Sequence, residues 1–134
     1  MPSGFPILVV DEDPTLADTL NQAAQHCFPE ASFHQVFTAP QAKTYLERLS
    51  NFSVRLVIMA INEQHSPEDL GLLAFLRAHD EAQSLPIFIL TTSLLPCDLM
   101  AAYTSYADSL TFKPFSLDDW AIYLNKLAQY SNVA

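Results

Sequence analysis

The chain alternates between short apolar runs and longer segments in which apolar residues recur every three or four positions. Residues 7–10 and 56–61 are unbroken apolar runs that include Val and Ile, a pattern typical of strands buried on both faces of a parallel sheet. Weaker runs predict further strands at residues 33–37, 86–92 and 110–112. The pattern therefore predicts five short strands.

Each predicted strand is followed by a segment with helical spacing. The predicted helices lie at residues 14–27, 40–49, 66–76, 96–106 and 116–127. Asp13 and Pro14 suit the N-cap and the first position of the first helix, where a missing N–H costs nothing. Ser116 suits the N-cap of the last helix.

Five strand–helix units in succession predict an α/β fold, a doubly wound five-stranded parallel sheet of flavodoxin-like (βα)5 topology with strand order 2-1-3-4-5. The length of 134 residues fits one hydrophobic core. We expect one domain at residues 6–127 and a short tail at 128–134. In this topology the loops after the first, third, fourth and fifth strands meet at one edge, so a site is expected there.

The composition narrows the classes of partner. Half of the residues are hydrophobic, which excludes a disordered chain, and the formal charge of −9 disfavours nucleic acid and anionic lipid surfaces. No apolar stretch reaches the roughly 20 residues that span a bilayer, and no signal peptide is recognisable, so we expect a cytoplasmic protein. The His and Cys residues lack the spacing of zinc ligands.

Polar residues gather at the predicted ends of four strands. The segments are ILVVDEDP, RLVIMAIN, PIFILTTS and LTFKPFSLDD, and their strand ends carry Asp11, Glu12, Ala60, Asn62, Thr91 and Lys113. In this order they resemble the receiver domain of bacterial two-component response regulators, and the resemblance covers Pro6 to Leu127.

The resemblance implies a role for each strand end. Asp11 and Glu12 match the acids that bind Mg²⁺, and Asn62 matches the residue whose carbonyl meets that metal. Thr91 matches the switch hydroxyl, and Lys113 matches the cation that contacts the phosphoryl group. In the family, that group is carried by an aspartate at the end of the third strand.

The sequence departs from the family at two positions. The position of the phosphoacceptor aspartate is Ala60, and a methyl group can neither attack phosphorus nor ligate a cation. The position of the switch aromatic on the fifth strand is Leu110. We therefore expect a pseudo-receiver without catalytic residues, which is not an enzyme and is not phosphorylated in the usual way.

Loss of one carboxylate changes the expected electrostatics of the site. Asp11 and Glu12 remain as possible Mg²⁺ ligands, but two acids are a weak set for an ion that sheds its hydration reluctantly. We expect weak or vestigial Mg²⁺ binding and no firm cofactor. Lys113 still faces the two acids, so an ion pair is expected to fill the site.

Two alternatives keep a phosphate-dependent function. A displaced acid, Glu63 or Asp69, would accept the phosphoryl group in place of the missing aspartate. Alternatively, Asp11 and Asp13 resemble the Asp-x-Asp nucleophile motif of haloacid-dehalogenase-like phosphatases. In that interpretation Asp13 would be a catalytic acid rather than a helix cap.

The function expected from the resemblance is two-component or phosphorelay signalling by protein–protein contact. The expected partners are a sensor kinase or another signalling protein, with a possible homodimer through the last two helices. Those helices form the usual partner surface of the family.

Overall fold

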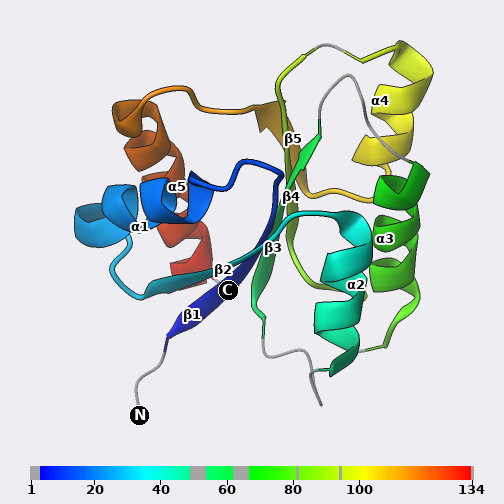
Figure 1. The fold of residues 1–134 in the computed structure, drawn as a ribbon, viewed down its shortest axis with the longest axis horizontal. Helices are drawn as coiled ribbons and strands as arrows, with labels where there is room; N and C mark the ends of the chain where they lie inside the picture. Colours follow the sequence, from blue (N-terminus) through cyan, green and yellow to red (C-terminus); the bar gives the residue numbers. More distant parts are fainter. Residues whose placement is uncertain (1–3, 49–53, 62–66, 81, 94, 134) are drawn as a thin grey trace.

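The structure is a computed structural model that describes residues 4–48, 54–61, 67–80, 82–93 and 95–133. Strands and helices alternate along the chain, as Figure 1 shows. The elements are β1 (Phe5–Val10), α1 (Leu16–Cys27), β2 (Ala31–Val36), α2 (Ala39–Arg48), β3 (Leu56–Ile61), α3 (Pro67–Ala78), β4 (Ile87–Thr91), α4 (Cys97–Thr104), β5 (Ser109–Phe112) and α5 (Leu117–Val133).

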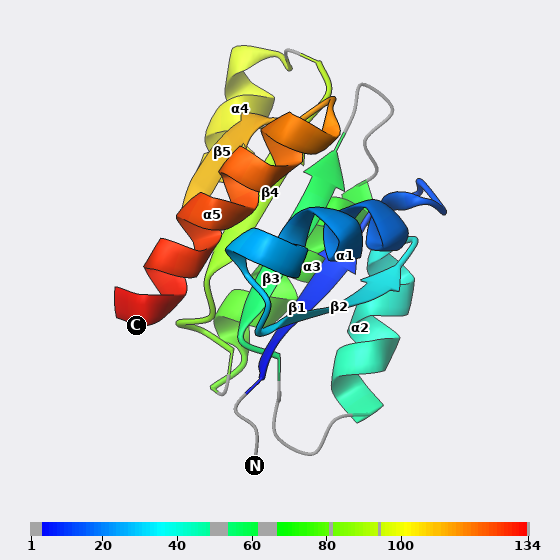
Figure 2. The same ribbon diagram turned by 90° about the vertical axis from the view of Figure 1, so that its left-hand side faces the viewer.

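The strands form one parallel sheet in the order β2-β1-β3-β4-β5. This confirms the predicted flavodoxin-like topology. Helices α1 and α5 cover one face of the sheet, and α2, α3 and α4 cover the other (Figures 1 and 2). Because the strands are parallel, all their carboxyl ends lie at one edge, where the following helices begin.

The continuous apolar run of β1 is explained by burial on both faces of the sheet. Ile7 and Val9 belong to the core beneath α1 and α5, whereas Leu8 and Val10 belong to the core beneath α2, α3 and α4. All four side chains are at most 4% exposed. A polar residue at any of these positions would lie in one of the two cores, which is why no alternation with polar residues is seen.

Of the two predicted helix N-caps, the structure confirms the one at Ser116 and contradicts the one at Asp13. Ser116 Oγ accepts a hydrogen bond from the backbone N–H of Asp119 at 3.0 Å, which confirms the cap of α5. The N-cap predicted at Asp13 was wrong, because α1 begins at Leu16 and Thr15 holds the cap position. Asp13 Oδ1 instead accepts hydrogen bonds from the N–H and the hydroxyl of Thr15 at 3.0 and 2.8 Å, closing the turn before the helix.

Helix α5 continues to Val133, through positions where the sequence predicts a short tail after residue 127. Its inward side buries Trp120, Leu124 and Leu127 against the sheet and α1. Among the described residues, no helix has the length and apolar character that a membrane crossing requires.

Arg77, at the end of α3, forms hydrogen bonds to several segments at the edge of the sheet opposite the carboxyl ends of the strands. Its guanidinium donates to the carbonyl of Tyr106 from Nε and Nη2, at 3.0 and 2.7 Å, and to the carbonyl of Leu85 from Nη1, at 2.7 Å. Nη2 also lies 3.2 Å from Asp108 Oδ2, which accepts from the N–H of Ile87 at 2.8 Å. One side chain thus joins α3 to the segments that enter β4 and β5.

The Arg77→Ala variant should be markedly less stable than the parent. Removing the guanidinium leaves half-buried carbonyls without a donor, so we expect the free energy of unfolding to fall by about 2–4 kcal/mol. The matched control is Arg48→Ala on the exposed last turn of α2, with an expected change within about 0.5 kcal/mol. Urea unfolding followed by the fluorescence of the buried Trp120 measures both, and equal losses would contradict the role given to Arg77.

Candidate functional site

A cavity of about 170 Å³ lies at the carboxyl edge of the sheet. Four of the residues predicted at the strand ends, Asp11, Glu12, Ala60 and Lys113, line it together. They come from the ends of β1, β3 and β5, which are far apart in the chain and adjacent or near in the sheet. The starts of α2 and α3 complete the wall with Phe37, Thr38, Ala39, Pro40, Glu68 and Asp69.

An ion pair between Lys113 and Asp11 dominates the electrostatics of this cavity. Lys113 Nζ donates to Asp11 Oδ2 at 2.6 Å, and the two side chains are 18% and 7% exposed. The other carboxylate oxygen, Oδ1, accepts the N–H of Asp13 at 3.0 Å. The ion pair expected from the sequence is therefore confirmed, with Asp11 as the acid. Glu12 remains exposed at the rim.

Ala60 lies beside this ion pair. Val10 of β1 is in register with Met59 of β3, so the next positions, Asp11 and Ala60, are neighbours across the two strands. Adjacent strands are about 4.8 Å apart, which places the methyl group of Ala60 within one side-chain length of the Asp11 carboxylate. A carboxylate at this position would compete with Asp11 for Lys113.

Gln35, on β2, holds the loop that carries the acids in place. Its Nε2 donates to the carbonyls of Asp11 and Asp13 at 2.8 and 2.7 Å, and its Oε1 accepts the N–H of Ala17 at 3.0 Å. Gln35 was not among the residues predicted from the sequence for this site. The hydrogen-bond partners of Gln35 lie 18 to 24 positions away, so no local pattern indicates them. The one feature of the sequence that could have pointed to Gln35 is a polar residue within the weak apolar run at 33–37.

The remaining predicted residues are placed differently. Thr91 is 1% exposed, and its hydroxyl donates to the carbonyl of Ser93 at 2.6 Å, within a local turn. The next residue, Thr92, lines the cavity instead. Leu110 is half-buried and packs against the core beneath α4. Asn62 lies outside the described residues.

Two acids of the alternative interpretations, Asp69 and Asp13, lie in the described part of the chain. Asp69 is half-buried and lines the cavity, whereas Glu63 lies outside the described residues. Burial raises the pKa of Tyr103 on α4 to about 12, and the Asp69 carboxylate adds to that shift. Asp13 accepts hydrogen bonds from the N–H and hydroxyl of Thr15, which lower the pKa of this exposed carboxylate, and it is not among the residues that line the cavity.

The described residues are a poor fit to a Mg²⁺ site. Both oxygens of Asp11 already accept hydrogen bonds, one of them from Lys113, and Ala60 contributes no ligand. In the part of the chain that the structure describes, no three His, Cys, Asp or Glu side chains are grouped to hold a metal ion. The cavity is instead neutralised in part by an internal cation.

A double-mutant cycle measures how strongly the ion pair holds β5 to β1. Lys113→Met should lower the free energy of unfolding by about 2–4 kcal/mol, because it leaves a buried carboxylate without its cation. Asp11→Asn combined with Lys113→Met should cost less than the sum of the single changes, with a coupling of about 1–3 kcal/mol. Additive effects in urea unfolding would show that the pair contributes no coupling.

Comparison with known proteins identifies the fold. No family model matches the sequence, and no curated protein matches it. Several solved structures do match. The cyanobacterial phytochrome response regulator RcpA, in its phosphorylated form, is 13% identical with a TM-score of 0.71, and the match covers 96% of this chain and 94% of that one.

Two further response regulators align equally well. The regulator of red light signalling in R. palustris is 16% identical with a TM-score of 0.75, covering 94% of this chain and 92% of that one. The chemotaxis response regulator CheY4 of Vibrio cholerae is 14% identical with a TM-score of 0.71, covering 93% and 99%. The chain therefore has the fold of a response-regulator receiver domain over nearly its whole length.

Proposed function

We propose that this chain is a receiver-like signalling module that acts through protein–protein contact and is not phosphorylated at the usual strand end. The single observation that carries the proposal is Ala60, which lies at the end of β3 in the wall of the cavity. The similarity to response regulators in fold supports a role in two-component signalling, with a sensor kinase or another signalling protein as the partner.

The chemistry of phosphoryl transfer supports this proposal. An acyl phosphate forms only where a carboxylate oxygen attacks phosphorus in line with the leaving oxygen. Ala60 has no such oxygen, and Asp11, the nearest buried carboxylate, already binds Lys113 and the N–H of Asp13. Both oxygens of the Asp11 carboxylate therefore already accept hydrogen bonds within the protein, and they are poorly placed to attack phosphorus.

The charge balance of the cavity supports the same proposal. A phosphoryl group or a divalent cation would have to compete with an existing ion pair of 2.6 Å. Exchanging one buried charge interaction for another brings little net gain, because each group must first lose its present partner. We infer that the cavity is a fixed structural element and that signalling depends on the surface of the domain.

A second candidate function rests on Asp69. This acid lines the same cavity as Lys113 and is half-buried, and of the two displaced acids it is the one that the structure describes. It belongs to the first turn of α3 rather than to a strand end, which makes near-attack geometry harder to hold.

The proposal predicts that acetyl phosphate with Mg²⁺ leaves the intact mass of the protein unchanged. Ala60→Asp, treated in parallel, is the positive control, since it restores a carboxylate at the strand end. A stable phosphoryl adduct on the wild-type protein would overturn the proposal. If Asp69→Asn then abolished that adduct, the second candidate function would replace it.

The Ala60→Asp substitution should also create a metal site. Ala60→Asp places a third carboxylate beside Asp11 and Glu12, so we expect Mg²⁺ to bind at least about tenfold more tightly than to the wild type. Ala60→Asn, which has nearly the same size without the charge, should not show this gain. Isothermal titration with Mg²⁺ compares the three proteins, and equal affinities would mean that the rest of the pocket cannot hold the ion.

A further inference from the structure

An open groove of about 650 Å³ runs between β5 and α5. Figure 2 shows these two elements side by side at the rim of the sheet. Ser109 and Thr111 of β5 line the groove on one side, and Ile122, Tyr123 and Lys126 of α5 line it on the other. Sites for small organic molecules typically measure about 300–1,000 Å³. The groove is therefore large enough to hold such a molecule.

The groove exists because β5 carries small hydroxyl residues where its neighbour β4 carries large apolar ones. Ser109 is in register with Phe88 of β4, and Thr111 is in register with Leu90. Residues in register on parallel strands point to the same face of the sheet. Leu90 belongs to the core beneath α1 and α5, and Phe88 packs against that core. Ser109 and Thr111 therefore point toward α5 without filling the layer that the β4 side chains fill.

One wall of the groove contains a buried polar atom that the fold leaves unsatisfied. The hydroxyl of Tyr123 is buried and has no hydrogen-bond partner in the described part of the chain. Burial also raises the pKa of Tyr123, so the phenol stays protonated at neutral pH and can donate a hydrogen bond. A buried donor without an acceptor is unfavourable. A small rotation of the ring toward the groove would bring this hydroxyl to an acceptor placed there.

Two charged side chains lie at opposite ends of the groove. Asp119 and Lys126 both line it and are seven positions apart on α5, which is about 10 Å along the helix axis. Neither has an ion-pair partner among the described residues. Lys126 follows Tyr123 by three positions, so these two side chains are neighbours on the helix surface. One end of the groove thus combines a cation with a hydroxyl donor, and the other end carries an anion.

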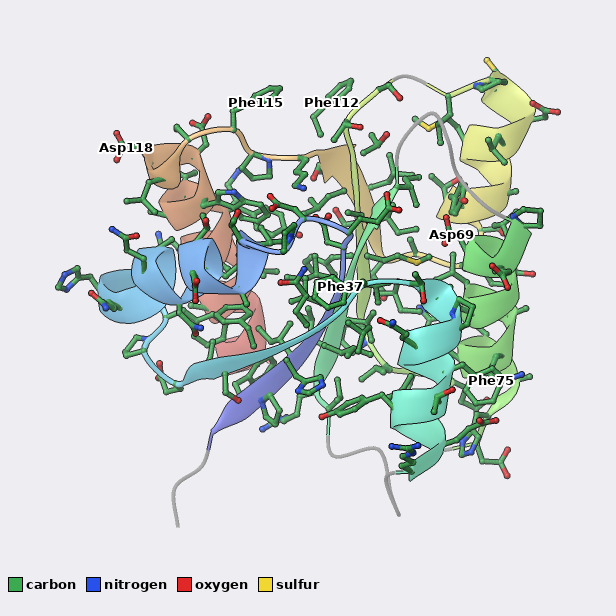
Figure 3. The ribbon with its side chains drawn as sticks, in the orientation of Figure 1. Phe37, Asp69, Phe75, Phe112, Phe115 and Asp118 are labelled. Carbon is green, nitrogen blue, oxygen red and sulfur yellow. The ribbon has the colours of Figure 1, made fainter. Side chains whose placement is uncertain are left out.

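Exposed apolar side chains border the rest of the groove. Phe112, Phe115 and Ile122 line it and are 60%, 92% and 59% exposed. Phe112 and Phe115 project from the same edge of the molecule in Figure 3. Apolar surface concentrated in this way on a protein with a well-buried core marks a binding site. The apolar part of a ligand would shield these side chains from water.

We propose that the groove binds a small amphipathic carboxylate, with one carboxylate head and an apolar body about 10 Å long, the length that separates the two charged ends. The head lies at Lys126, where it accepts hydrogen bonds from the ammonium group and from the Tyr123 hydroxyl. The body extends over Thr111 and along Ile122 toward Phe115.

The positions of the charges select this head group and its orientation. A carboxylate at the Lys126 end gains a cation and a hydroxyl donor at once, and charge-assisted hydrogen bonds of this kind are strong. The same group at the other end would meet the like charge of Asp119, so the ligand binds in one direction. The net charge of −9 opposes any anion at long range, but this repulsion is screened beyond about 8 Å at physiological salt. The contact at Lys126 therefore decides the preference.

This site goes beyond the contact function proposed above, because it requires neither phosphoryl transfer nor a protein partner. The test compares octanoate, octanol and octylammonium, which share one apolar chain and differ in head group, by isothermal titration of the full chain. Octanoate should bind at least about tenfold more tightly than either of the others, because only its head can pair with Lys126. Octylammonium that binds as tightly as octanoate would overturn the proposal.

Variants of the groove separate the head group from the apolar body. Lys126→Gln should weaken octanoate at least about tenfold and leave octanol unchanged, because it removes the charge and keeps the groove. Tyr123→Phe should weaken octanoate about threefold or more through loss of the donor. Thr111→Leu should fill the groove and abolish the binding of both probes. Lys43→Gln, which removes the same charge from α2 on the other face of the sheet, is the matched control and should change neither.

Circular dichroism confirms that each variant is folded. A wild-type protein that binds no octanoate, or an equal loss of binding in Lys43→Gln and Lys126→Gln, would overturn the proposal. Octanoate binding that weakens as the protein concentration is raised would show that a second copy of the chain covers the groove, and this result would also overturn it. None of these results alters the response to acetyl phosphate, so failure of the ligand site would leave the pseudo-receiver function standing.

Discussion

Burial of the central strands on both faces is the constraint on which the rest of this structure depends. β1 and β3 can bury Leu8, Val9, Val57 and Ile58 on alternating sides only if helices cover the sheet above and below. In this chain a helix crosses over a face of the sheet between each pair of successive strands, so all strands are parallel and their carboxyl ends lie at one edge. Asp11, Ala60 and Lys113 meet in space for this reason alone, although they are about fifty positions apart from one to the next in the chain.

Local and periodic features of the chain were sufficient to predict the elements of the fold and part of the cavity wall, including Asp11, Ala60 and Lys113. The apolar runs located the strands, and a hydroxyl before an acidic turn located the start of α5 at Ser116. Asp13 shows the limit of that reasoning. Its side chain can cap a helix or close an Asx turn with nearly the same local sequence, and the positions of β2 and the first loop decide between them.

Long-range hydrogen bonds could not be predicted in this way. Gln35 and Arg77 each donate hydrogen bonds to backbone carbonyls of distant segments. Every residue has such a carbonyl, so the sequence does not indicate which carbonyls accept from a side chain. Thr91 and Thr92 illustrate the same problem at closer range. Adjacent residues of a strand face opposite ways, so a turn at the strand end decides which hydroxyl reaches the cavity, and Thr91 is committed to Ser93.

The alanine at position 60 affects the charge balance of the cavity as well as its capacity for chemistry. Three carboxylates at one strand edge would repel each other and would require a cation to balance them, whereas Asp11 alone is balanced by Lys113. A pocket that needs an external ion can respond to that ion. Where Lys113 already balances Asp11, an external cation has less charge to neutralise and must compete with an existing ion pair.

Lys113 is where this fixed pocket meets the exposed surface, since it lines both the cavity and the groove beside β5. Its N–H donates to the carbonyl of Thr91 at 2.9 Å and its ammonium binds Asp11, so the end of β5 is held to β4 and to β1 at once. Phe112 directly precedes Lys113 in the chain, and Phe115 follows it by two positions. The contacts of Lys113 therefore determine where these two exposed side chains lie. Under the proposed function, binding to this surface would therefore depend on the concentration of the partner rather than on a phosphoryl group.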